Sequence, residues 1–140
     1  MSRLQLALNV SDLEASIAFY SALLGTEPHK VRPGCANFAV AEPPLKLVLV
    51  ESAAEGGSIN HLGVEVGDVD AVDAELARLA ARGLATTEER DTTCCHARQE
   101  KFWVRGAPDG ERWEVYTITD DAPVDPPADA AVAPTEACCA

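Results

Sequence analysis

The stretch Gln5-Leu6-Ala7-Leu8-Asn9-Val10-Ser11-Asp12 is matched, at a constant offset, by His61-Leu62-Gly63-Val64-Glu65-Val66-Gly67-Asp68. In each copy apolar and polar residues alternate, as they do in a strand that is buried on one face. Each copy then reaches an aspartate, a residue type that often caps the start of a helix. The repeat therefore divides the chain into two units of the same design.

An amphipathic helix is predicted after each aspartate, because apolar residues recur every three or four positions. Gly25 and Gly83 follow the last periodic residues, where a glycine commonly ends a helix. The apolar positions are Leu13, Ile17, Tyr20 and Leu24 in the first helix, and Val69, Val72, Leu76 and Leu79 in the second.

Three strand-like stretches follow each helix, and Ala107-Pro108-Asp109-Gly110 is a strong hairpin signal between the last two. The pattern predicts an α+β fold of two tandem βαβββ units, about 3–51 and 59–119, that form a cupped, incomplete barrel around a shared cleft. The whole domain spans 1–119. The predicted strands are 27–31, 35–41 and 45–51 in the first unit, and 85–91, 99–105 and 112–119 in the second.

Composition narrows the classes of function. The chain of 140 residues carries 11 basic and 23 acidic side chains, a formal charge of -12, which argues against nucleic acid as a partner. It contains no apolar run near the roughly 18 residues that a membrane span needs. Strand-like alternation starts at once and leaves no room for a signal peptide, so a cytoplasmic location is expected. Segment 120–140 is rich in Pro, Ala and acids and is predicted to be a flexible tail ending in Cys138-Cys139.

Alternation also assigns side chains to the two faces of the sheet. Leu6, Leu8 and their counterparts belong to the helix-covered core, so Gln5 and His61 share the other face. Ala7 and Gly63 beside them are small and leave room for a ligand. On the last strand, Glu114 stands between apolar neighbours, where a carboxylate is costly unless it is paired or binds a metal.

Gln5, His61 and Glu114 together offer one nitrogen and two oxygen donors. This is a variant of the two-histidine, one-carboxylate set that holds non-haem Fe(II) and leaves coordination positions open. Taken singly, Gln5 is an ordinary strand residue, His61 a histidine at a strand start, and Glu114 a carboxylate that Arg112 or Lys101 could pair. The alignment of Gln5 with His61 by the repeat favours a common metal site over three unrelated residues.

Cys94 and Cys95 are adjacent, and Cα atoms about 3.8 Å apart across a trans peptide are too close for an ordinary disulfide between them. Two neighbouring sulfurs suit one thiophilic centre. The alternative is a pair of small buried residues, but Thr92, Thr93 and His96 indicate a polar loop. The five cysteines, an odd number with two adjacent pairs, suggest reduced thiols rather than a secreted disulfide framework.

The chain resembles the vicinal oxygen chelate superfamily, the group of glyoxalases, bleomycin-resistance proteins and extradiol dioxygenases. The resemblance covers about residues 3–119. It is carried by Val10-Ser11-Asp12-Leu13-Glu14-Ala15-Ser16 through Phe19-Tyr20, by Leu24-Gly25, by His61-Leu62-Gly63-Val64, by Pro108-Asp109-Gly110 and by Trp113-Glu114-Val115-Tyr116.

Within that superfamily, Thr92-Thr93-Cys94-Cys95 with Gln99, Lys101, Trp103 and the terminal Cys138-Cys139 is similar to the carbon–arsenic lyases and their cadmium-induced relatives. The resemblance implies cleavage, with Fe(II) and O₂, of trivalent methyl or aryl arsenicals to arsenite. It implies metal ligands at Gln5, His61 and Glu114, and places catalytic, substrate-binding thiols at Cys94 and Cys95.

Three positions depart from what the resemblance implies. Gln5 stands where the superfamily usually has histidine, and His96 stands where a tyrosine commonly follows the cysteine pair. Leu47 is expected at the position where a glyoxalase-type site would carry a fourth ligand, a carboxylate. The lack of a carboxylate there argues against a glyoxalase.

Several alternatives stay open on the sequence. Mn(II), Ni(II) or Zn(II) could use the same donors, and the cup could close within one chain or across a homodimer. The rival function is a non-catalytic protein that sequesters metalloids or cadmium through its thiols. Another enzyme on the same scaffold, such as a glyoxalase or a thiol transferase acting on an antibiotic, is a second rival.

Overall fold

The computed structural model describes residues 2–94 and 97–120, with Cys94 described through its backbone only. The elements repeat the order βαβββ twice, as predicted. They are β1 (Arg3–Val10), α1 (Leu13–Leu24), β2 (Lys30–Arg32), β3 (Cys35–Val40), β4 (Leu45–Glu51), β5 (Ile59–Glu65), α2 (Val69–Ala81), β6 (Thr86–Cys94), β7 (Ala97–Val104) and β8 (Trp113–Asp120).

Both helices begin where the sequence predicts. The carboxylate of Asp12 accepts a hydrogen bond from the backbone N–H of Ala15, and Asp68 accepts one from Ala71 in the same way. These bonds satisfy N–H groups that a helix start otherwise leaves without partners. Helix α1 ends at Gly25, whose φ of 66° lies in the left-handed region that favours glycine.

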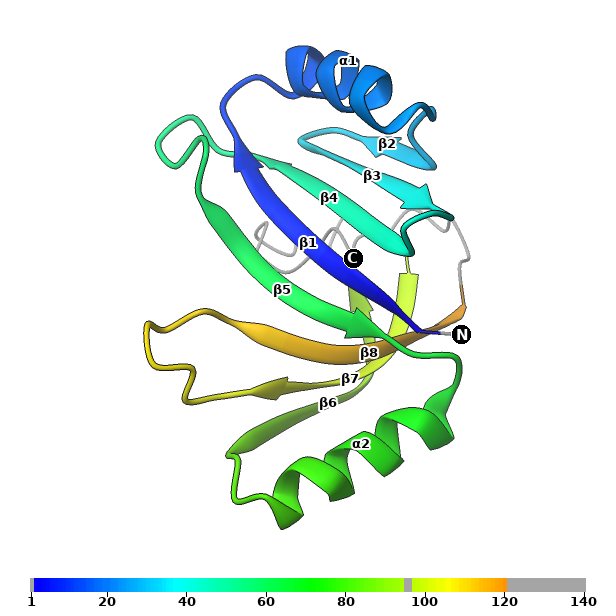
Figure 1. Cartoon of the computed structure of the whole chain (residues 1–140), viewed down its shortest axis with the longest axis vertical. Helices are drawn as coiled ribbons and strands as arrows, with labels where there is room; N and C mark the ends of the chain where they lie inside the picture. The colour runs from blue at the N-terminus through cyan, green and yellow to red at the C-terminus, as the bar shows by residue number, and fades with distance from the viewer. Residues whose placement is uncertain (1, 95–96, 121–140) are drawn as a thin grey trace, which may run out of the picture.

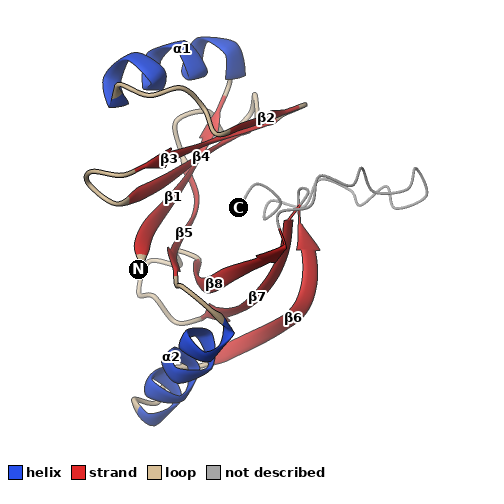
Figure 2. Ribbon diagram, turned by 90° about the vertical axis from the view of Figure 1, so that its right-hand side faces the viewer, coloured by secondary structure: helices blue, strands red, loops and turns tan. Residues whose placement is uncertain are grey.

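All strands belong to one open sheet with the order β2-β3-β4-β1-β5-β8-β7-β6. The sheet curves into a cup, and the two helices lie on its outer side (Figures 1 and 2). The predicted cupped, incomplete barrel is thus confirmed, since the sheet is not closed. In the described part of the chain no helix is long and apolar enough to cross a membrane.

The two units meet where β1 pairs with β5 in antiparallel register, Gln5 opposite Gly63 and Ala7 opposite His61. Within each unit the first and last strands pair in parallel, β1 with β4 and β5 with β8. This arrangement is a pseudo-two-fold about the β1–β5 seam, as the repeat implies, and it brings Gln5 and His61 close together.

Each helix covers its own core. Leu13, Ile17, Tyr20 and Leu24 of α1 pack against a cluster that includes Phe38. In the second unit Val72, Leu76 and Leu79 of α2 pack with Phe102 and Val115. The inner face of the cup therefore lies on the side of the sheet away from both helices.

Two expectations are corrected. The stretch from Thr92 to Cys94 is strand, not loop, because Thr92 pairs with Gln99 and Cys94 pairs with Ala97. Cys35 is disulfide-bonded, which contradicts the expectation of reduced thiols throughout. Cys95, His96 and the predicted tail from residue 121 onward lie outside the described residues.

Candidate metal centre and its surroundings

Three buried side chains converge at the middle of the inner face: Gln5 from β1, His61 from β5 and Glu114 from β8. None of them is exposed to solvent. Gln5 Nε2 lies 2.9 Å from His61 Nε2 and 3.2 Å from Glu114 Oε1, and the last two atoms are 3.4 Å apart. The structure therefore brings together all three residues of the predicted metal site.

Gln5 Nε2, His61 Nε2 and Glu114 Oε1 form a triangle, and this triangle has the size of one face of a coordination octahedron. With metal–ligand bonds of about 2.1 Å, neighbouring ligand atoms of an octahedral complex lie about 3 Å apart. No group of three or more His, Cys, Asp or Glu side chains suited to a metal gathers within residues 2–94 and 97–120. The candidate site depends on the amide of Gln5 as its third donor.

The amide oxygen of Gln5 supports this role. Gln5 Oε1 is buried and has no hydrogen-bond partner, while Nε2 faces the other two donors. A half-turn of the terminal amide exchanges the two atoms, and their assignment follows the hydrogen-bond network. Turned in this way, the amide presents an oxygen beside His61 and Glu114, and the set fits a divalent metal.

The orientation of His61 is held by a chain of polar side chains behind it. His61 Nδ1 lies 2.7 Å from Asn60 Oδ1, and Asn60 Nδ2 donates to Asn9 Oδ1 at 3.0 Å. Asn9 Nδ2 in turn donates to Ser58 Oγ at 2.9 Å. Because an amide oxygen only accepts, His61 Nδ1–H donates to Asn60, and this bond fixes the ring so that Nε2 is directed at Gln5 and Glu114, where it can bind a metal. No pattern in the sequence singles out Asn60, apart from its position next to His61.

Glu114 is ionised in spite of its burial. Burial alone opposes the charge, but contact with His61 and the ammonium group of Lys101 outweigh it and hold the pKa of the Glu114 carboxyl below its usual value. Lys101 Nζ donates to Glu114 Oε2 at 2.9 Å, and this lysine is itself fully buried. Of the two cations that the sequence offered as partners of Glu114, Lys101 makes this bond, and Oε1 is left directed at the triangle.

Gly63 makes room for the triangle rather than for a ligand. A Cβ atom on Gly63 would lie 3.0 Å from Glu114 Cγ, 3.1 Å from Glu114 O and 3.6 Å from Gln5 Cβ. The space expected from the small residue at this position is filled by the side chains of the candidate site.

The prediction that Leu47 occupies the position of a fourth ligand is wrong by one residue. Gly63 pairs with Glu114, and its counterpart Ala7 pairs with Val48, so Val48 is the structural equivalent of Glu114. Leu47 instead belongs to the core under α1. The error arose because the two units have strands and loops of different length before β4 and β8. An apolar Val48 supplies no ligand, so the inference that the slot lacks a carboxylate is unchanged.

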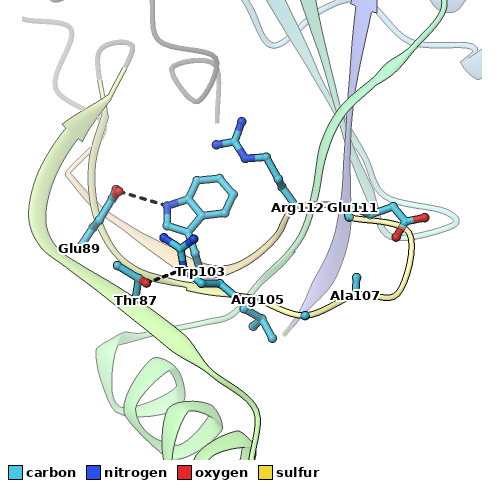
Figure 3. Close-up of a pocket in the computed structure, with 10 residues that line it drawn as sticks. Thr87, Glu89, Trp103, Arg105, Ala107, Glu111 and Arg112 are labelled. Atoms are coloured by element: carbon cyan, nitrogen blue, oxygen red, sulfur yellow. Dashed lines mark hydrogen bonds between the residues drawn. The ribbon is translucent and has the colours of Figure 1, made fainter.

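Trp103 links the candidate site to a pocket of about 340 Å³. The Trp103 ring contacts the His61 ring edge-on, with centroids 5.6 Å apart, and its Nε1 donates to Glu89 Oε1. The guanidinium carbon of Arg112 lies 4.7 Å from the centroid of the Trp103 ring. Figure 3 shows Trp103 and Arg112 together in the lining of the pocket, with Arg105 below them.

The inner face carries further buried polar groups near Glu114. Burial lowers the pKa of Lys46 to about 8, and its Nζ lies 5.5 Å from the centroid of the Tyr116 ring. Burial raises the pKa of Tyr116, whose hydroxyl has no hydrogen-bond partner. Gln99, also fully buried, has no partner for either amide atom. The inner face therefore carries several polar side chains besides the three of the candidate site.

Residues 3–115 match the sequence pattern of the family described as "Glyoxalase/Bleomycin resistance protein/Dioxygenase superfamily". The chain belongs to this superfamily. Membership in this superfamily suggests a divalent metal site, and the cluster of Gln5, His61 and Glu114 is consistent with one.

Two curated relatives are similar over most of their length. A trivalent organoarsenical cleaving enzyme of Thermomonospora curvata is 63% identical over 123 residues, which cover 87% of this chain and 81% of the relative. The cadmium-induced protein CadI of Mycobacterium tuberculosis is 62% identical over 122 residues, which cover 87% of this chain and 80% of the relative.

Solved structures share the fold at lower identity. An extradiol ring-cleaving dioxygenase from B. fuscum superposes with a TM-score of 0.58 at 19% identity, covering 87% of this chain and 35% of the dioxygenase chain. The methylmalonyl-CoA epimerase of M. tuberculosis gives a TM-score of 0.53 at 20% identity, covering 81% of this chain and 85% of the epimerase chain.

Proposed function

We propose that this protein cleaves the carbon–arsenic bond of trivalent methyl or aromatic arsenicals, with Fe(II) and O₂, and releases arsenite. The supporting observation is the convergence of Gln5, His61 and Glu114 within 3.4 Å of one another. A relative that is 63% identical is named a trivalent organoarsenical cleaving enzyme. Such an activity confers resistance to arsenicals, and we expect the protein to work in the cytoplasm.

Gln5, His61 and Glu114 are the proposed ligands of Fe(II). One imidazole, one carboxylate and one amide make a hard to intermediate donor set that leaves three octahedral positions open. The bound iron would supply the activation of O₂ that an oxidative cleavage needs. Mn(II), Ni(II) or Zn(II) fit the same donors, and the metal content of the purified protein decides between them.

Cys94 and Cys95 are the proposed thiols for the substrate. A trivalent arsenical R–As(OH)₂ and two thiols give R–As(S–Cys)₂ and two molecules of water, so the carbon–arsenic bond survives the binding step. Soft thiolates hold the arsenic and harder donors hold the iron, so each site prefers its own ion. The backbone of Cys94 lies at the end of β6, opposite Ala97 of β7.

The pocket beside Trp103 is the proposed receptor for the organic group. Its volume of about 340 Å³ accommodates an aromatic ring, and the Trp103 ring that lines it also contacts His61. The methyl group of a methyl arsenical fills little of that volume. We therefore expect aryl arsenicals to depend on this pocket more than methyl arsenicals do.

The second candidate function is sequestration of cadmium or metalloids by thiols. The 62% identity to a protein named cadmium-induced favours it. The two functions differ in product, because only an enzyme converts a methyl arsenical to inorganic arsenite.

The deciding experiment is aerobic incubation of the Fe(II)-loaded protein with methylarsenite, followed by separation of the arsenic species. We expect inorganic arsenite to accumulate over many turnovers, and none to form without O₂. The double variant Cys94→Ser/Cys95→Ser should keep its iron and lose turnover, whereas Glu114→Ala should lose iron and still bind the arsenical. Tight binding of methylarsenite and cadmium with no arsenite formed, at full iron loading, would assign the protein to sequestration.

A further inference from the structure

Lys101 is a buried lysine whose ammonium group is held in one place by its surroundings. Its side chain is fully buried, and its Nζ donates to Glu114 Oε2 at 2.9 Å. The same Nζ lies over two aromatic rings, 5.5 Å from the centroid of Trp103 and 6.0 Å from the centroid of Tyr116. A cation at such a distance over an aromatic ring is attracted to it. The ammonium group is therefore fixed beside the Glu114 carboxylate by three separate contacts.

The two carboxylate oxygens of Glu114 have different partners. Oε1 lies 3.2 Å from Gln5 Nε2 and 3.4 Å from His61 Nε2, on the side of the candidate metal centre. Oε2 accepts the hydrogen bond from Lys101. A carboxylate can bind a metal through one oxygen or through both. The partners of Glu114 thus distinguish the oxygen that faces the metal centre from the oxygen that does not.

Binding of a metal to both oxygens would disturb the contact with Lys101. An ammonium group offers only donors, and its positive charge repels a divalent cation at the same oxygen. If Oε2 turned to the metal, the ammonium of Lys101 would stay fully buried without its counter-charge. A buried charge that loses its partner is strongly unfavourable. The contacts of Lys101 therefore favour a metal bound to Oε1 only.

We propose that Lys101 is a positioning residue that makes Glu114 bind the metal through Oε1 alone. The inference rests on the proposed metal site of Gln5, His61 and Glu114. With one donor atom from each of these residues, three positions of an octahedral ion stay open, and a second oxygen of Glu114 would take one of them. Cleavage with O₂ needs open positions on the iron. Lys101 preserves one that the carboxylate would otherwise fill.

The test counts the water molecules bound to Mn(II), which fits the same donors and gives an EPR signal. Pulsed EPR in ¹⁷O-labelled water counts them without any turnover. We expect three waters in the wild type, one for each open position. Lys101→Met keeps most of the apolar stem and removes the donor, so both oxygens of Glu114 become available and one water should be lost.

Lys46→Met is the matched control. Lys46 is another buried lysine near Glu114, and its Nζ lies 5.5 Å from the centroid of the Tyr116 ring. Within the described residues, the lysine that donates to Glu114 is Lys101, not Lys46. The control therefore removes a buried positive charge and leaves the bond to Oε2 in place, and its water count should equal that of the wild type.

Three results would overturn the inference: one water too few in the wild type, an unchanged count in Lys101→Met, or the same loss in Lys46→Met. The first of these is measured on the wild type and does not depend on whether either methionine variant folds.

Failure of the proposed function gives different results. If Glu114→Ala binds Mn(II) as tightly as the wild type, the metal site is wrong and the role of Lys101 falls with it. If the Fe(II)-loaded wild type never cleaves methylarsenite but Lys101→Met still loses one water from Mn(II), the enzymatic proposal fails while the role of Lys101 stands.

Discussion

Gly63 and Glu114 lie opposite each other on the parallel strands β5 and β8, and a Cβ atom on Gly63 would come within 3.0 Å of Glu114 Cγ. This close approach of Glu114 to the backbone of Gly63 places the Glu114 carboxylate beside Gln5 and His61. The absence of a side chain at position 63 is therefore part of the candidate metal centre, although Gly63 provides no donor itself.

Gly63→Ala should both destabilise the fold and weaken metal binding. Because the nearest atoms include the Glu114 backbone, the strand has to shift, and overpacking of this kind costs about 1–3 kcal/mol. Gly56→Ala is a matched control, since its Cβ would lie 2.9 Å from Ser11 Cβ, on residues outside the triangle. Thermal unfolding with and without Fe(II) should show a loss of stability in both variants and a loss of metal affinity only in Gly63→Ala.

Gln5→Glu should increase the dependence of stability on metal. The new carboxylate would lie near Glu114 Oε1, where Gln5 Nε2 is now 3.2 Å away, and two like charges at this distance repel in the metal-free protein. A divalent ion removes the repulsion, so the rise in Tm on adding Fe(II) should exceed that of the wild type. Gln5→Leu should show almost no rise. Equal rises in all three proteins would mean that Gln5 is not a ligand.

Asn60→Leu should lower metal affinity by about 10- to 100-fold, the usual effect of losing the group that orients a ligating histidine. The reason is that Asn60 Oδ1 accepts the proton of His61 Nδ1 at 2.7 Å. Asn60→Asp keeps an acceptor and should retain affinity. Ser58→Ala, at the far end of the same hydrogen-bond chain, should change it only slightly. Competition with a coloured chelator measures all four proteins.

Trp103→Leu should change the preference between substrates. The indole lines the pocket of about 340 Å³ and contacts His61, so its loss should lower kcat/KM for a phenyl arsenical about tenfold or more and affect a methyl arsenical less. Arg105→Met, which alters the same pocket away from His61, should affect the preference less. A uniform loss for both substrates in Trp103→Leu would argue against the pocket as the receptor of the organic group.

The repeat predicted much of this architecture because it reflects how the two units meet. The period-2 pattern of β1 and β5 implied that Gln5 and His61 share a face, and the β1–β5 register confirms it. Asp12, Asp68 and Gly25 marked helix ends through local hydrogen bonds and backbone conformation, which act within a few residues.

Features that depend on distant parts of the chain were harder to predict. The equivalence of Val48 with Glu114 follows from the pairing of β4 with β1 and of β8 with β5. The sequence shows where these strands lie only approximately, so the predicted register was in error by one residue. The segment around Thr92 was predicted to be a loop because its side chains are polar, but its backbone pairs with β7. The link from Asn60 to Asn9 joins residues on different strands that no local pattern connects.

The seam between β1 and β5 divides the donor set, since Gln5 belongs to the first unit while His61 and Glu114 belong to the second. A slip of one residue at this junction would turn Gln5 outward and dismantle the triangle. An ion bound there would contact both units at once. Because the donor set exists only when the units are joined, the free energy of metal binding would add to the free energy of unfolding.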